Sequence, residues 1–214
     1  MAKVSVVIPT YNRPMLLTTR ALPSVFRQDT DMELEIIVVG DGTDEVTVYE
    51  MADIMQEDGR VSFKNLPRQQ YTGDPQTDWC VLGLEARNYG YEHATGDFLI
   101  GLDDDDALLP HMIRVLHKAL VDGGVDVAYG RSLAFNSENK HVASYGTWPP
   151  MHFCMTEGSW LAKHDLGYRL DPACVERGLP EDGDKIDRMV ADGRKFAFVN
   201  EVVHHYLPNP RGVA

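Results

Sequence analysis

Short apolar runs rich in Val and Ile alternate, along the first half of the chain, with stretches whose apolar residues recur at helical spacing. Such runs are typical of strands buried on both faces of a sheet, and the periodic stretches are typical of helices packed on it. Strands are predicted at residues 3–9, 34–40, 60–66 and 97–102. Helices are predicted at residues 15–28, 44–59, 80–96 and 110–124, and Pro23 interrupts or ends the first of them.

This alternation predicts an α/β fold, with a mostly parallel, doubly wound sheet that carries helices on both faces. Open sheets of this kind bind ligands beyond the carboxyl ends of their strands. We therefore expect three loops to meet in one crevice: those that follow Ile8, Val39 and Leu102.

The pattern changes beyond Val125, where the strands become short and are predicted to be antiparallel or to lie at the sheet edge. We expect this half to cover one side of the crevice and not to form a separate domain. The predicted elements are strands at 125–135 and 140–146, an irregular segment at 147–160, a helix at 180–193 and a pair of strands at 195–207.

Composition narrows the class of protein. The chain has 214 residues, enough for one sizeable core, and its formal net charge is −13. That charge disfavours direct nucleic-acid binding, which needs clustered Lys and Arg. Three cysteines without close spacing predict a reducing compartment. No apolar stretch reaches the ~18–20 residues of a membrane span, and the N-terminus does not fit a signal peptide, so we expect a cytoplasmic protein.

Four aspartates, Asp103, Asp104, Asp105 and Asp106, follow the apolar run "FLIGL" directly. A solvated turn or a helix N-terminus explains one or two carboxylates, but it explains four adjacent ones poorly. Residues i and i+2 of an extended segment point the same way, so Asp103 and Asp105 could share a cation. Carboxylate oxygens suit Mg²⁺ or Mn²⁺. Asp106 is predicted instead to cap the helix that follows.

Two other loops at the same predicted edge contain candidate ligand-binding residues. Asp41 stands between Gly40 and Gly42, a combination that fits either a simple turn or a close approach of a ligand to the backbone. Its carboxylate could accept a hydrogen bond from a nucleobase or a ribose. Tyr11, in "IPTYNRP", fits either a stacking position for a base or a place in the core.

Four segments, "VSVVIPTYNRP", "EIIVVGDGTDE", "EARNYGYEHATGDFLIGLDDDD" and "PEDGDKIDRM", occur in the order and at the spacing of family 2 glycosyltransferases of the GT-A fold. The chain resembles that family up to about Leu207. The resemblance implies a single GT-A domain over 1–214, with a nucleotide-sugar-binding half at 1–110 and an acceptor-binding and catalytic-base half at 111–214. It also implies metal-dependent, inverting transfer from a nucleotide-diphosphate sugar, with a UDP-sugar favoured and Mn²⁺ or Mg²⁺ as the cofactor.

By this resemblance, "LDDDDALLP" carries the D-x-D motif of the family, with Asp103 and Asp105 in its two acidic positions. Tyr11 and Asp41 would hold the nucleobase, and the aspartates would hold the ribose and the metal-bound diphosphate. Gly40 departs from the family, in which a second aspartate is common at that position. The donor-binding residues that the resemblance implies are Pro9, Thr10, Tyr11, Asn12, Arg13, Asp41, Arg87, Asp103 and Asp104.

The resemblance also assigns residues to catalysis. Asp182 would be the general base, which removes the proton of the acceptor hydroxyl, and Glu181 would be the runner-up or an orienting partner. Acidic residues also favour a helix N-terminus, and we prefer that interpretation for Asp184 and Asp187.

Late histidines and two tryptophans complete the candidates. His204 and His205 point to opposite faces of a predicted strand, so at most one of them can join Asp103 and Asp105 at a metal; a surface or core position fits about as well. Trp148 and Trp160 could stack on an acceptor sugar, with the core as the default. The polar loop at 68–78 could close over the donor.

Two other functions fit parts of the same pattern. A nucleotidyltransferase that makes nucleotide sugars would use similar aspartates, but "IPTYNRP" lacks the Gly-rich loop and basic residue such an enzyme needs for a triphosphate. A non-catalytic nucleotide-sugar-binding module would not need both the aspartate run and the Glu181–Asp182 pair.

The acceptor could be a glycan, a lipid-linked sugar or another hydroxyl compound, and a homo-oligomer is compatible with the sequence.

Overall fold

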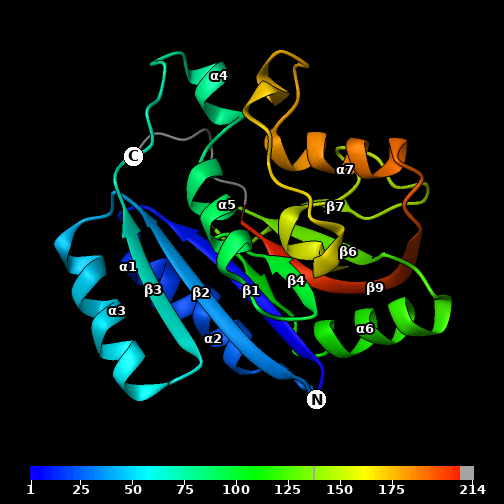
Figure 1. The fold of residues 1–214 in the computed structure, drawn as a ribbon, viewed down its shortest axis with the longest axis horizontal. Helices are drawn as coiled ribbons and strands as arrows, with labels where there is room; N and C mark the ends of the chain where they lie inside the picture. Colours follow the sequence, from blue (N-terminus) through cyan, green and yellow to red (C-terminus); the bar gives the residue numbers. More distant parts are fainter. Residues whose placement is uncertain (137, 208–214) are drawn as a thin grey trace.

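The computed structural model describes residues 1–136 and 138–207. Its strands form one nine-stranded sheet in the order β3-β2-β1-β4-β8-β6-β9-β5, with β7 beside β6 (Figure 1). The strands are β1 Lys3–Thr10, β2 Glu33–Asp41, β3 Val61–Leu66, β4 Phe98–Gly101, β5 Ala107–Leu108, β6 Val127–Phe135, β7 His141–Tyr145, β8 Trp160–Lys163 and β9 Phe196–Tyr206. The helices are α1 Pro14–Leu16, α2 Leu22–Phe26, α3 Glu45–Glu57, α4 Pro75–Trp79, α5 Leu84–His93, α6 Met112–Gly123 and α7 Glu181–Ala191.

The first half of the sheet is parallel. Strand β1 pairs in parallel with β2 and β4, and β2 pairs in parallel with β3. In the second half, β8 pairs antiparallel with both β4 and β6, while β9 runs parallel to β6. The predicted α/β class with a small antiparallel part is therefore confirmed. The aspartates follow the end of β4, at the edge where β1 and β2 also end.

Helices cover both faces of the sheet. The side chains of Val4, Val6 and Ile8 pack in one core cluster with residues of α2, α3 and α6, whereas Val7 packs with residues of α5 on the other face. Figure 1 shows α5 in front of the sheet and α1 and α2 behind it. This alternation follows from the two-residue period of a strand, and it explains why consecutive residues of β1, from Val6 to Pro9, are apolar.

The predicted helix at 15–28 is continuous from Pro14 to Phe26 but irregular. It consists of α1, a π-helical turn at Leu17–Ala21 and α2, with Pro23 in the first turn of α2. Pro lacks the N–H that a continuous helix needs, but it fits a first turn, where that N–H has no partner. The predicted helix at 80–96 begins only at Leu84, after Gly83 with φ +69°, and α4 forms in the preceding loop, capped by Asp74.

One prediction for the second half is wrong. The terminal pair of strands is one strand, β9, because both of its parts pair with β6 across a shift in register. Residues 147–156 are irregular, as predicted, but β8, which starts at Trp160 and joins β4 to β6, was missed. No helix in the described parts of the chain combines the length and apolar character needed to cross a membrane.

Candidate active site

Three of the four aspartates converge. Asp103, Asp105 and Asp106 each offer an oxygen atom, and these oxygens lie within 4.8 Å of one another. Burial raises the pKa of Asp105, with a further contribution from the neighbouring carboxylates, and it raises the pKa of Asp106 against the opposing effect of His204. A divalent cation would relieve this repulsion, and hard oxygen donors are the ligands that Mg²⁺ and Mn²⁺ prefer. The donor set therefore fits the predicted metal.

Asp104 faces the end of β1 instead. Its Oδ2 accepts a hydrogen bond from Thr10 Oγ1 at 2.7 Å, and its Oδ1 lies 3.3 Å from Arg13 Nη1. The same guanidinium nitrogen donates to Asp105 Oδ2 at 2.9 Å. Burial raises the pKa of Asp104 to about 6, against the opposing effect of Arg13. Thr10 and Arg13, both predicted to bind the donor, thus hold the aspartate run.

The prediction that Asp106 caps the following helix is wrong. Strand β5 intervenes and pairs with β9, and α6 begins after His111 without a side-chain cap. Asp106 instead accepts a hydrogen bond from the backbone N–H of Leu207 at 2.7 Å, and its Oδ2 lies 3.0 Å from Nε2 of the fully buried His204. His205 lies on the opposite face of β9, with its ring 4.9 Å from that of Phe135. Of the two histidines, His204 is the one beside the carboxylate group.

The loops after β1 and β2 meet as predicted, but through a residue that the sequence analysis missed. Arg68 lies with its Cζ 3.4 Å from the ring centre of Tyr11 and donates from Nη1 to Asp41 Oδ2 at 2.6 Å. Tyr71 donates to the same oxygen at 2.8 Å, and the backbone N–H of Gln69 donates to Oδ1 at 2.7 Å. The predicted base-binding pair, Tyr11 and Asp41, is therefore already engaged by the loop at 68–78.

Asn12 and Pro9 shape this part of the crevice. Asn12 has φ +51°, a conformation that Asn tolerates better than most residues, and its Oδ1 accepts a hydrogen bond from the Asp44 N–H at 2.7 Å. It thereby ties the loop after β1 to the start of α3. Pro9 lies at the end of β1 opposite Val39 of β2 and beneath Gly83.

Arg87 connects the aspartates to Glu181, the neighbour of the predicted base Asp182. It is 5% exposed, and its Nη2 donates to Asp103 Oδ1 at 2.8 Å and lies 3.8 Å from Glu181 Oε1. Burial raises the pKa of Glu181 well above its usual range, with a further contribution from Asp182. Burial, reinforced by Glu157 and opposed by Arg87, raises the pKa of Asp182 to about 6. A partly exposed carboxylate of this kind suits proton removal near neutral pH.

A buried charged cluster behind Asp182 was not foreseen. Lys185 Nζ lies 4.1 Å from the ring centre of Tyr91, 4.4 Å from that of Trp160 and 3.7 Å from Glu157 Oε1. Tyr91 also donates to Glu157 Oε1. The sequence places Lys185 one helical turn after Asp182 on α7. It gives no sign of the contacts with Tyr91, Trp160 and Glu157, because these residues are distant along the chain. Trp160 takes the core position, with 2% exposure, whereas Trp148 is 60% exposed.

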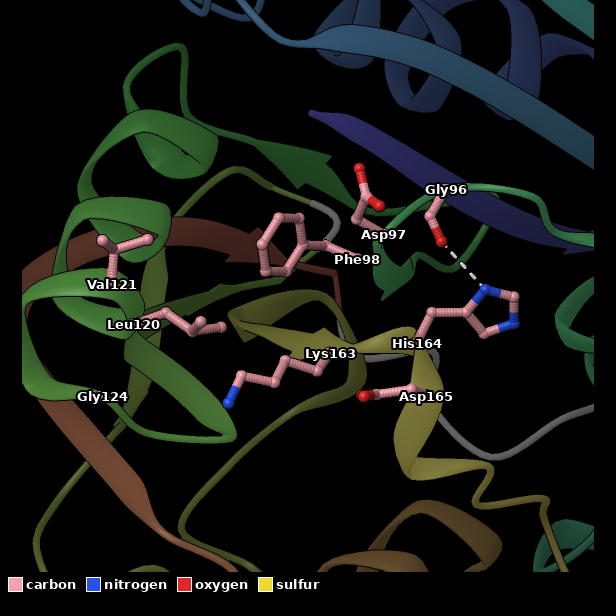
Figure 2. A pocket seen from close by; sticks show the side chains of 9 residues that line it. All are labelled: Gly96, Asp97, Phe98, Leu120, Val121, Gly124, Lys163, His164 and Asp165. Carbon is pink, nitrogen blue, oxygen red and sulfur yellow. Dashed lines mark hydrogen bonds between the residues drawn. The ribbon is translucent and has the colours of Figure 1, made fainter. Parts of the chain in front are cut away.

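A separate cavity of about 670 Å³ lies at the other end of β4 (Figure 2). Phe98, Leu120 and Lys163 contribute to its lining, and His164 Nδ1 bonds to the Gly96 carbonyl at its rim. Since the aspartates follow the carboxyl end of β4 and this cavity lies at the start of the strand, we do not assign the donor to it.

Comparison with known proteins identifies the family. The model of "Glycosyl transferase family 2" matches residues 5–74 and 82–168. The chain therefore belongs to glycosyltransferase family 2, as its motifs predict. Over 123 residues it is 32% identical to a GalNAc(5)-diNAcBac-PP-undecaprenol beta-1,3-glucosyltransferase of Campylobacter jejuni, a match that covers 58% of this chain and 36% of the relative.

Solved structures agree on the fold. TarS 1-349 of S. aureus in complex with UDP matches with a TM-score of 0.71 and 16% identity, over 97% of this chain and 61% of that one. The mannosyltransferase PcManGT of Pyrobaculum calidifontis, in complex with GDP-Man and Mn2+, matches with a TM-score of 0.68 and 17% identity, over 98% of this chain and 58% of that one. The chain thus covers less than two thirds of each of these three relatives. The GT-A prediction is confirmed.

Proposed function

We propose that this chain transfers a sugar from a nucleotide-diphosphate sugar to an acceptor hydroxyl, with inversion at the anomeric carbon and dependence on a divalent cation. The observation that carries the proposal is the bridge made by Arg87, which connects the convergent carboxylates at Asp103 to the acid pair Glu181–Asp182. An in-line displacement needs the carboxylates, which would hold the leaving diphosphate, on one side of the anomeric carbon. It needs the base, which activates the acceptor hydroxyl, on the other side.

The donor side uses the first half of the chain, residues 1–110. Asp103, Asp105 and Asp106 would hold Mn²⁺ or Mg²⁺, with His204 behind Asp106. The cation would neutralise charge that develops on the diphosphate leaving group. The UDP and GDP-Man complexes of the structural neighbours support a nucleotide donor, and we favour a UDP-sugar.

The base site is shaped by Arg68. Because its guanidinium covers one face of the Tyr11 ring, a nucleobase must use the other face or displace Arg68 from Tyr11 and Asp41. The loop at 68–78 is therefore the part of the chain that we expect to adjust when the donor binds.

Asp182 acts on the acceptor. In its ionised form it accepts the proton of the acceptor hydroxyl as the hydroxyl oxygen attacks the anomeric carbon, and the bond from that carbon to the diphosphate breaks in the same displacement. Glu181, held by Arg87, keeps the neighbouring charge low because its raised pKa favours the protonated form. Only one of the adjacent acids then serves as the base.

Residues 111–214 would bind the acceptor. We propose a saccharide hydroxyl, carried on a glycan or on a lipid-linked sugar, because the name of the C. jejuni relative describes a lipid-linked acceptor. The exposed ring of Trp148 is available for stacking on a sugar face.

Calorimetric titration with UDP, GDP, TDP and CDP, each with and without Mn²⁺, tests the donor side. We expect micromolar binding of one of them, lost without the cation and weakened in Asp105→Ala. If the folded protein bound none of the four nucleotides, the proposed activity would be unsupported and only the similarity in fold would remain.

A further inference from the structure

Tyr206 ends β9 beside the carboxylate group. It follows His204 by two residues, so both side chains lie on the same face of the strand, with ring centres 6.4 Å apart. The next backbone N–H, that of Leu207, donates to Asp106 Oδ1 at 2.7 Å and fixes this end of β9 against the aspartates. On its other side the Tyr206 ring meets the ring of Tyr145 edge-on at 6.0 Å.

Within residues 1–136 and 138–207 no hydrogen bond is made by the Tyr206 hydroxyl, and the residue is only partly buried. The charges that act on it come from both sides of the crevice: Asp106 and Asp103 at the carboxylate group, and Asp182 at the base. A phenol has an unperturbed pKa of about 10 and keeps its proton near neutral pH. It is a neutral donor in a strongly acidic crevice.

We propose that the Tyr206 hydroxyl donates a hydrogen bond to the diphosphate of the donor. This inference rests on the proposed function. The space between the carboxylates and Asp182 must hold the diphosphate and the sugar being transferred. The bond from the Leu207 N–H to Asp106 fixes the adjacent Tyr206 at the end of β9 beside the carboxylates, which would hold the metal-bound diphosphate. A phenol adds a hydrogen bond to an anionic oxygen without adding charge, and such bonds are among the stronger ones in proteins.

The test is calorimetric titration of Tyr206→Phe with UDP and with UMP, both in Mn²⁺. The variant keeps the ring against Tyr145 and removes only the donor. We expect affinity for UDP to fall roughly tenfold or more, as for a lost hydrogen bond to a charged group, and affinity for UMP to change less than about twofold. Tyr49→Phe, on the exposed face of α3, is the matched control and should bind both as the parent does.

The results separate failure of the Tyr206 inference from failure of the proposed function. If the parent chain binds UDP and Tyr206→Phe binds it equally well, the inference is wrong while the proposed function stands. An equal loss for UDP and UMP would also overturn it, because the effect would not depend on the second phosphate. If the parent prefers GDP, then GDP and GMP replace the probes; if it binds no nucleoside diphosphate, the proposed function itself fails.

Discussion

Arg87 donates from Nη2 to Asp103 Oδ1 at 2.8 Å, so a buried guanidinium on α5 holds the first of the four aspartates after β4. The same group lies 3.8 Å from Glu181 at the start of α7. One cation thus lies between two acidic clusters that belong to different halves of the chain.

Replacing this cation should destabilise the fold. In Arg87→Met, Asp103 and Glu181 would lose their shared partner, and we expect the free energy of unfolding to fall by about 3 kcal/mol, as for a broken buried ion pair. Arg114→Met removes an exposed pair with Asp29 and should cost under about 1 kcal/mol. Urea unfolding measures both; similar values for the two variants would contradict the bridging role.

Asp182→Asn should abolish transfer. Loss of a general base typically costs about 10²–10⁴-fold in rate, while the carboxylates and Arg87 that would hold the donor stay in place. Turnover should therefore collapse with nucleotide affinity nearly unchanged. Asp187→Asn, on the same helix but bonded to His152, is the control and should retain activity. Parental turnover in Asp182→Asn would show that another group is the base.

The rate should depend on pH through Asp182. Its pKa is about 6 in the folded chain, and only the ionised form accepts a proton, so kcat should rise with pH through about 6 and level off about one pH unit higher. Glu157 raises this pKa, so Glu157→Gln should move the rising limb to lower pH. A pH–rate profile of both proteins measures the shift, and a limb displaced upwards would be contrary to this electrostatic account.

Mn²⁺ should stabilise the chain through Asp105. At about 100 times its dissociation constant, a ligand adds roughly 2.7 kcal/mol, or about 5–10 °C in Tm for a chain of this size. Asp105→Asn should lose this response. Without metal it should melt above the parent, because one of the crowded carboxylates is gone. Asp122→Asn, exposed on α6, should respond to Mn²⁺ as the parent does. A full response in Asp105→Asn would remove it from the metal site.

Gly101→Ala should be poorly tolerated. A Cβ at this position would collide with the side chains of Glu157 and Tyr91, and overpacking of this kind costs about 1–3 kcal/mol. Gly59→Ala has nothing within 4 Å of the added carbon and is the matched control. Equal unfolding midpoints for the two variants would show that the buried cluster adjusts freely.

Local patterns were enough for the parallel half of the fold. Apolar runs identified β1, β2 and β4, because a strand buried on both faces needs a nearly continuous apolar sequence. The four aspartates identified the carboxylate group because adjacent carboxylates behind a buried strand repel one another unless a partner is present. The motifs around Asp41, Arg87 and Asp182 indicated the family, which the comparison confirmed.

The tertiary structure decided what each candidate contacts. Asp106 pairs with His204, Arg68 covers Tyr11, and Lys185 lies between Tyr91 and Trp160. These contacts join residues dozens of positions apart, so no spacing along the chain encodes them. Burial supplies the rest: a carboxylate shifts its pKa only when folding removes water and sets other charges beside it. Residue types and periods are local properties of a sequence, whereas desolvation and long-range pairing exist only once the chain has folded.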